Sequence, residues 1–100
     1  MPPVRFAPGA LQDLQRLREF LRPKSPGAAR RAGQAIQQGI RVPSQQSRMG
    51  RTIEDMPEHF REWPIHFGDS GYVVRYRISP DGSVTILAIW HQREAATPSP

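Results

Sequence analysis

The sequence predicts an α+β domain in which a short N-terminal strand and a helix hairpin pack on an antiparallel β-sheet. Two segments between residues 8 and 42 carry apolar side chains at helical spacing. Three segments between residues 60 and 91 are rich in β-branched and aromatic residues, and glycine-containing turns separate them. A chain of 100 residues fits one domain with a modest core. We place this domain at residues 1–94 and expect residues 95–100 to form a flexible tail.

The N-terminal segment predicts a short strand followed by an amphipathic helix. Residues 4–7 alternate briefly between apolar and polar side chains. Pro8 suits the first turn of a helix, where its missing N–H has no partner to lose. The helix then carries leucines at helical spacing with Phe20 beside them, and it must end before Pro23. These leucines are Leu11, Leu14, Leu17 and Leu21.

A second helix is predicted to begin at Ser25, a hydroxyl cap that precedes Pro26 at the first helical position. Its apolar face is narrow and made mostly of small residues, so we expect close approach to the first helix as a helix hairpin. That face consists of Ala28, Ala29, Ala32, Ala35, Ile36 and Ile40. Pro43 is expected to end or bend the helix.

The second half of the chain predicts the sheet. After a polar connector at residues 44–50, we expect strands at residues 51–56, 60–67, 72–78 and 84–91. Turns at residues 68–71 and 79–82 join the last three strands as hairpins. Pro64 favours an edge position or a bulge for its strand. The last strand is apolar on both faces, with Val84, Ile86, Ala88 and Trp90 alternating with Thr85, Leu87, Ile89 and His91, and is therefore expected at the centre.

The charge and composition narrow the function. The net charge is +5, and thirteen of the 14 cationic residues are arginine. Arginine favours two-pronged contacts to carboxylate and phosphate, which indicates an acidic protein segment or nucleic acid as partner; a GC-rich genome explains the same ratio equally well. The absence of cysteine excludes disulfides and thiolate chemistry. The sequence has no membrane-length apolar run and no signal-peptide core, so a cytoplasmic protein is expected.

Arginines on the predicted sheet are candidates for a binding surface. Arg75 and Arg77 share one face of a strand, and pairing about the 68–71 turn would bring Arg61 close to Arg77. We expect the three to form a basic face that binds RNA phosphate or an acidic peptide. The alternative is a solvated sheet face, on which long cations discourage edge-to-edge pairing.

His91, at the end of the last predicted strand, is followed closely by Arg93. A histidine beside a cation is a candidate general acid or base for phosphodiester cleavage, although it is also an ordinary polar strand end. The remaining histidines, His59 and His66, lack metal-ligand spacing, so no metal site is expected. Phosphate-binding loops, dinucleotide fingerprints and serine-hydrolase elbows are absent from the sequence, and no cofactor is expected.

Short motifs across residues 4–94 resemble those of the ParE/RelE superfamily, the toxins of type II toxin–antitoxin systems, and in particular its ParE-like, plasmid-stabilisation members. Each motif is short, but their order and spacing are specific. They are residues 6–14 (Phe-Ala-Pro-Gly-Ala-Leu-Gln-Asp-Leu), 25–30 (Ser-Pro-Gly-Ala-Ala-Arg), Gly50-Arg51, Phe60-Arg61-Glu62, 71–78 (Gly-Tyr-Val-Val-Arg-Tyr-Arg-Ile) and 89–93 (Ile-Trp-His-Gln-Arg).

The resemblance implies a cytotoxin that a cognate antitoxin holds inactive in a hetero-oligomer. Such antitoxins carry an acidic, partly disordered tail, and the toxin's positive charge is complementary to it. The implied target is DNA gyrase for ParE-like members, and ribosome-bound mRNA for RelE-like members, which cut it as endoribonucleases.

The sequence departs from the ribonuclease pattern in ways that favour a ParE-like inhibitor without enzymatic activity. Val73 stands where an arginine is expected, and no tyrosine follows Arg93. The alternative remains a RelE-like, ribosome-dependent mRNA endoribonuclease, for which His91 and Arg93 are the catalytic candidates. The predicted surface for target or antitoxin is made of Arg61, Arg75, Arg77 and Arg93.

Overall fold

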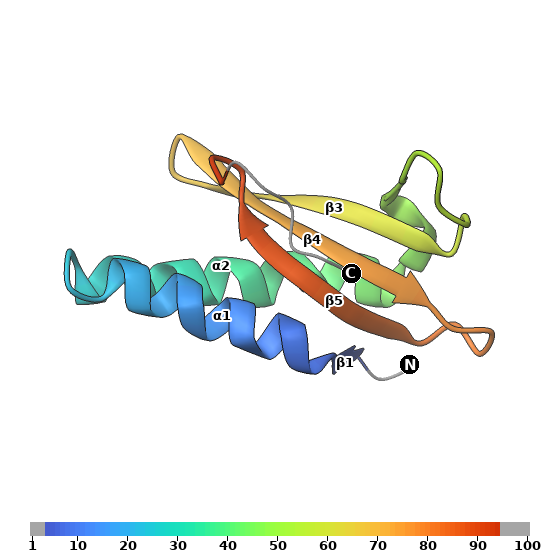
Figure 1. Ribbon diagram of the computed structural model, residues 1–100, viewed down its shortest axis with the longest axis horizontal. Helices are drawn as coiled ribbons and strands as arrows, with labels where there is room; N and C mark the ends of the chain where they lie inside the picture. The colour runs from blue at the N-terminus through green and yellow to red at the C-terminus, as the bar shows by residue number, and fades with distance from the viewer. Residues whose placement is uncertain (1–3, 95–100) are drawn as a thin grey trace.

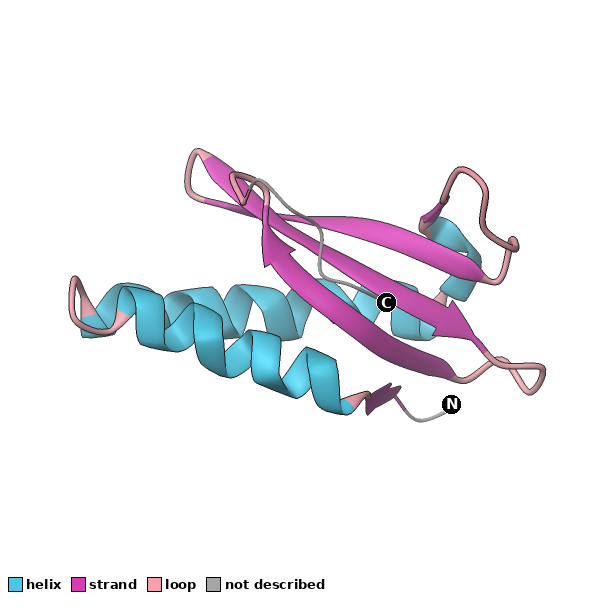
Figure 2. Ribbon diagram, in the orientation of Figure 1, coloured by secondary structure: helices cyan, strands magenta, loops and turns pink. Residues whose placement is uncertain are grey.

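A computed structural model describes residues 4–94, so the tail predicted at residues 95–100 lies outside the described part. Two helices form one layer and a five-stranded sheet forms the other (Figures 1 and 2). The elements are β1 (Val4–Phe6), α1 (Pro8–Leu21), α2 (Pro26–Gln45), a 3₁₀ turn η1 (Ser47–Met49), β2 (Arg51–Thr52), β3 (Phe60–Phe67), β4 (Ser70–Ile78) and β5 (Val84–His91).

The sheet has the order β1-β5-β4-β3-β2. The three hairpin-like pairings from β2 to β5 are antiparallel, whereas β1 lies parallel to β5 and makes the sheet mixed. The α+β class is confirmed, and so is the internal position of β5. Pro64 lies on β3 beyond its two-residue pairing with β2, where the strand edge is open and a missing N–H costs no ladder hydrogen bond.

Helix α1 buries a narrower stripe than the leucine spacing indicates. Ala10 and Leu17 are buried, and Leu14 and Leu21 pack partly against the same core. Leu11 and Phe20, however, are 53% and 64% exposed. The stripe follows positions 10, 14, 17 and 21, so the residues beside it on the helix face outward. The expectation that Leu11 belongs to the core face is therefore wrong.

Helix α2 begins as predicted and ends later than predicted. The backbone N–H of Ala28 donates to Ser25 Oγ at 3.1 Å, which is the expected cap. Pro43 does not end the helix, because its ring is fully buried and the following turn closes with a 2.8 Å bond from the Gln46 N–H to the Val42 carbonyl. The strand expected at residues 51–56 shortens to two residues, since the chain turns at Asp55 with a φ of 64°.

A β-bulge reverses the predicted facing of the end of β5. Opposite the Arg75–Tyr76 step, the pairing skips Leu87. As a result Ile89 and His91 continue the helix-facing side of the strand, and Trp90 turns to the outer face of the sheet. The alternation that placed Trp90 with the helix-facing residues of β5 is wrong, because an extra residue shifts every later side chain to the other face.

Tyr76 and Arg61 fasten the connection between α2 and β3 to the sheet. The buried Tyr76 hydroxyl donates to the Ser47 carbonyl at 2.6 Å and accepts from the Gly50 N–H at 2.9 Å. The Arg61 guanidinium donates to the carbonyls of Glu58, Arg48 and Gly50 at 2.8, 3.2 and 3.0 Å. We call this arrangement the Tyr76 latch.

We expect the protein to lose stability above about pH 10. Burial raises the pKa of Tyr72 and of Tyr76 above the ordinary value of 10.0. The unfolded chain therefore loses its tyrosine protons first, and stability present below pH 10 is lost as the pH rises. Urea unfolding at increasing pH measures the effect. The double variant Tyr72→Phe/Tyr76→Phe should show a shallower decline, and equal slopes would contradict the assignment.

Candidate functional site

A cleft of about 790 Å³ opens between the C-terminal half of α1, the β3–β4 turn and the end of β5. These three segments lie at the same end of the molecule (Figure 1). Its apolar lining comes from Leu17, Phe20, Leu21, Phe67 and Tyr72, and its polar lining includes Lys24, Ser70, His91 and Arg93. We call it the His91 cleft. Because Phe20 is exposed, the cleft presents aromatic surface directly to solvent.

Three contacts fix the orientation of the His91 ring. Its Nδ1 accepts the Arg93 N–H at 3.1 Å, and its Nε2 lies 2.9 Å from Ser70 Oγ. Since Nδ1 accepts, the neutral ring carries its proton on Nε2 and donates it to Ser70. The ring also packs edge-on against Tyr72, with centroids 5.3 Å apart. Both nitrogens are therefore occupied, and a substrate would have to displace one of these contacts.

Arg93 and Glu94 line the cleft beyond the end of β5 and differ in how firmly they are held. The Arg93 side chain is 71% exposed and lies 3.9 Å from the exposed Asp69, a distance at which an ion pair contributes little. Glu94 instead accepts from the Arg16 guanidinium at 2.7 Å and from the His91 N–H at 3.2 Å. The hydrogen bond to Glu94 raises the pKa of Arg16, so this cation stays charged and fixes the turn after β5.

Asp13 continues the edge pairing of β5 where β1 ends. Strand β1 covers β5 only as far as Ile86. Farther along, Asp13 Oδ2 accepts the Ile89 N–H at 2.9 Å, and Arg16 donates to the Ile89 carbonyl at 3.3 Å. Sequence reasoning included Asp13 in a family-like motif without a role, and it missed Arg16 and Ser70 altogether. A polar Asp–x–x–Arg pattern on an amphipathic helix was the only signal available.

The predicted basic face does not form. Arg61 pairs with Tyr76 across the sheet and so lies on the helix-facing side, within the Tyr76 latch. Arg75 lies on the outer face, 2.8 Å from Glu62 and 5.5 Å from the Trp90 ring. The expectation that Arg61, Arg75 and Arg77 share one face is wrong, because the β3–β4 register sets Arg61 opposite an inward-facing residue.

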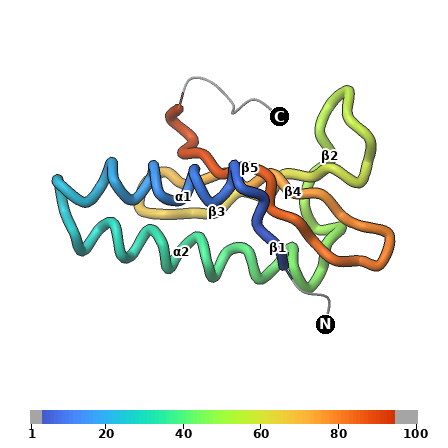
Figure 3. Tube along the Cα trace, turned by 60° about the horizontal axis from the view of Figure 1, so that its bottom comes forward, coloured from blue at the N-terminus to red at the C-terminus, as the bar shows by residue number. Residues whose placement is uncertain are grey.

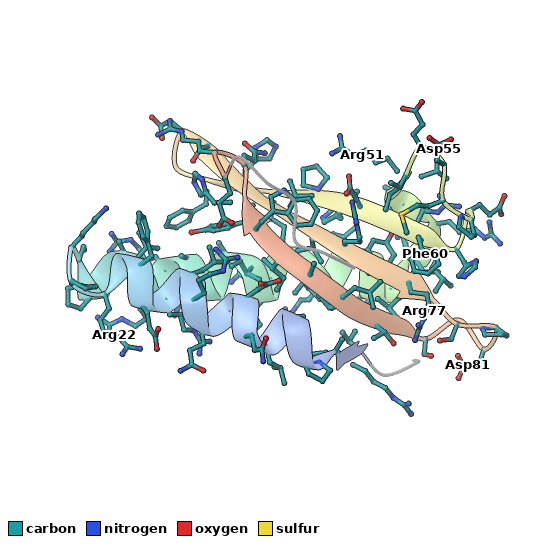
Figure 4. The ribbon with its side chains drawn as sticks, in the orientation of Figure 1. Arg22, Arg51, Asp55, Phe60, Arg77 and Asp81 are labelled. Atoms are coloured by element: carbon teal, nitrogen blue, oxygen red, sulfur yellow. The ribbon has the colours of Figure 1, made fainter. Side chains whose placement is uncertain are left out.

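Arg77 and Arg93, the exposed arginines of the predicted binding surface, lie far from one another along the sheet. Arg77 is exposed on the outer face near the 79–82 turn (Figure 4), whereas Arg93 follows the opposite end of β5. The other histidines are apart from both: His59 packs on Phe60, and His66 is exposed on β3. Within residues 4–94, no three histidine, aspartate or glutamate side chains gather to hold a metal ion.

Comparison with known proteins identifies the chain's family. A family model described as the ParE toxin of the type II toxin–antitoxin system parDE matches residues 4–96. The chain belongs to this toxin family. Membership makes the ParE-family chain the toxin component of a type II toxin–antitoxin system and implies a cognate antitoxin. Neither helix in the described part is long and apolar enough to cross a membrane.

Two relatives of this ParE-family toxin come from Caulobacter vibrioides. The protein named Toxin RelE3 is 37% identical over 94 residues, covering 94% of this chain and 98% of the relative. The protein named Toxin RelE1 is 34% identical over 85 residues, covering 85% of this chain and 87% of the relative. Full-length similarity at this level places the ParE-family toxin within the wider ParE/RelE superfamily.

A solved structure shares the fold. The structure described as the chromosomal ParDE toxin–antitoxin system from P. aeruginosa superposes with a TM-score of 0.70, covering 91% of this chain and 96% of that one. Because the two are only 17% identical, this likeness shows the fold alone.

Proposed function

We propose that this ParE-family toxin acts in the cytoplasm by binding and inhibiting DNA gyrase, that it does not cut RNA, and that its antitoxin silences it in a hetero-oligomer. The separation of His91 from the sheet arginines Arg75 and Arg77 carries the proposal. Cleavage of a phosphodiester needs an acid or base and cations within hydrogen-bond reach of the same phosphate. His91 faces the helices, whereas Arg75 and Arg77 face outward from the other side of the sheet.

Two of the sheet arginines, Arg61 and Arg75, are already engaged within the protein. Arg75 is half-buried and paired with Glu62, and Arg61 donates to three backbone carbonyls. Freeing Arg75 would deprive the largely buried Glu62 carboxylate of its partner at 2.8 Å, and freeing Arg61 would deprive the part-buried Gly50 carbonyl of a hydrogen bond at 3.0 Å. A buried polar group left without its partner costs about 1–3 kcal/mol. The guanidinium groups of Arg61 and Arg75 therefore stabilise the fold and are not available to contact an RNA phosphate.

The His91 cleft offers a surface for a protein target. Aromatic residues in a pocket are typical anchors of protein–protein interfaces. Phe20 lies at the cleft with Lys24 over its ring at 4.0 Å, and Arg93 is exposed at the rim. We propose that Phe20 and Arg93 contact gyrase. Arg77 lies outside the cleft and stays a predicted contact for the target or the antitoxin.

A RelE-like endoribonuclease is the second candidate. Two relatives carry the name RelE, and the hydrogen-bonded His91–Ser70 pair lines the cleft. In that reaction the His91 ring would give up its hydrogen bond to Ser70 and act as the acid or base toward the RNA. Arg93, two residues farther along the chain, would be the exposed cation beside it.

We expect Phe20→Ala to weaken inhibition of gyrase supercoiling about tenfold, which corresponds to about 1.4 kcal/mol of lost contact. Phe20 is 64% exposed, so the fold should lose little stability. Leu11→Ala is the matched control, since Leu11 is 53% exposed on the same helix and lies outside the cleft. Purified toxin free of antitoxin is assayed for supercoiling inhibition and for cleavage of ribosome-bound mRNA, in one buffer.

The two assays separate the candidates. Inhibited supercoiling with intact mRNA is the expected outcome. Cut mRNA with normal supercoiling would overturn the gyrase proposal, and loss of cutting in His91→Gln with retained antitoxin binding would assign the acid–base role to His91.

A further inference from the structure

A second groove, of about 480 Å³, lies between the two helices. The helices run side by side as the hairpin in Figure 3, and Figure 4 shows Arg22 directed away from the sheet. The groove is lined from α1 by Arg18 and Arg22 and from α2 by Arg30, Gln34 and Gln37. We call it the arginine groove. It is separate from the His91 cleft, with which it shares no lining residue.

The polar side of α2 carries arginine and glutamine and no acidic residue. Over its twenty residues, Pro26–Gln45, the helix has no aspartate or glutamate. Its polar residues Arg30, Gln34, Gln37 and Arg41 recur at intervals of three or four and share one face of the helix. The first three line the arginine groove, and Arg41 lines an adjoining recess with the apolar residues Val4, Phe6 and Leu14. The result is a row of donors about three helical turns long.

The groove arginines are not neutralised by the protein itself. Within residues 4–94, the arginines in salt bridges are Arg16, Arg48, Arg51, Arg75 and Arg93, all outside the groove. The guanidinium of Arg18 crosses close to Gly33, where a Cβ would stand 3.7 Å from Nε and Nη2. Small residues at the groove floor, Ala29 and Gly33, thus leave room for an anion beside Arg18.

The composition of the arginine groove favours phosphate over a protein surface as its ligand. Protein interfaces are anchored by buried aromatic or apolar side chains and are depleted of charge at their centre. The lining of the arginine groove contains no aromatic side chain, and its apolar members are Pro26, Ala29 and Gly33. Arginine binds phosphate with two parallel hydrogen bonds, and glutamine adds neutral donors.

We propose that the arginine groove binds the phosphate backbone of duplex DNA. The choice of DNA over RNA rests on the proposed function, because gyrase holds duplex DNA and a toxin bound to it lies close to that polyanion. Contact through the backbone alone gives binding that is independent of base sequence and weakens steeply with salt.

Fluorescence anisotropy of a labelled 20-base-pair duplex with the purified toxin tests the proposal. The groove variant is Arg18→Gln/Arg22→Gln/Arg30→Gln. The matched control, Arg5→Gln/Arg48→Gln/Arg51→Gln, removes three charges from exposed positions outside the groove. At about 50 mM salt we expect the groove variant to bind at least tenfold more weakly, and its log–log salt dependence to fall by about two to three. The control should change less than threefold. Circular dichroism confirms that both variants fold.

The proposal would be overturned by no duplex binding of the wild-type toxin, by equal weakening in the two variants, or by tenfold tighter binding of duplex RNA with the same sequence. A groove variant that keeps its DNA affinity but loses antitoxin affinity would likewise overturn it and assign the groove to an acidic protein. Supercoiling inhibition is measured on the same samples. A wild type that binds DNA through the groove but leaves gyrase active would overturn the proposed function alone.

Discussion

Replacing Gly50 with alanine is expected to lower the free energy of unfolding by about 3 kcal/mol or more. A Cβ at this position would overlap the Tyr76 hydroxyl, which donates to Ser47 and accepts from the Gly50 N–H. Tyr76 is fully buried, so it has no open space into which to move. The substitution therefore combines overpacking with the loss of two buried hydrogen bonds.

Thermal unfolding measures this effect directly. At about 4–8 °C per kcal/mol for a domain of this size, the midpoint should fall by more than 10 °C. Gly9→Ala is the control, because its added Cβ meets only the Leu87 carbonyl at an ordinary 3.7 Å. That variant should match the wild type or gain up to about 1 kcal/mol. Equal midpoints for the two alanine variants would show that the Tyr76 latch is dispensable.

The second large effect is expected at Asp13. Asp13→Ala should cost about 2 kcal/mol, because the Ile89 N–H loses its acceptor at an edge that β1 does not reach. Arg16 would also lose one of its two acidic partners, although Glu94 would remain. The loss would loosen β5 close to His91.

Urea unfolding of Asp13→Ala and Asp13→Asn tests this role. Asparagine keeps an acceptor oxygen and should recover about half of the loss. Asp69→Ala is the control: its side chain is 94% exposed, and its substitution should change stability by less than about 0.5 kcal/mol. A loss as large in Asp69→Ala as in Asp13→Ala would indicate a general charge effect instead of a specific bond to β5.

Local patterns predicted the elements that depend on neighbouring residues. The cap at Ser25, the start of α1 at Pro8 and the 79–82 turn are encoded within a few residues of themselves. The turn predicted at 68–71 is shorter in the structure, where β4 already begins at Ser70 and pairs with Phe67. The family followed from the order of such short signals along the chain. The predicted positions of Leu11 and Trp90 were wrong, and α2 does not end at Pro43, because each depends on what packs against the segment, which a local pattern does not contain.

The candidate site was predicted in part. His91 and Arg93 stand beside a cleft, but Phe20, Ser70 and Arg16 reach it from segments far away in the sequence. Arg61 shows why the basic face was predicted wrongly: strand register decides which face a side chain takes, and the register depends on partner strands.

The sequence by itself indicated the α+β class, the helix hairpin, the internal position of the last strand and the net charge, and its motifs resembled those of the toxin family. The structural features follow from composition and periodicity, which act through near neighbours, whereas the family rests on the resemblance of short motifs to those of known toxins. Only the tertiary structure decided that β1 runs parallel to β5, that a bulge turns Trp90 outward, and that Arg61 and Arg75 lie on opposite faces. The physical reason is that pairing across the sheet and packing between layers join residues distant in the chain, and those contacts override local preference.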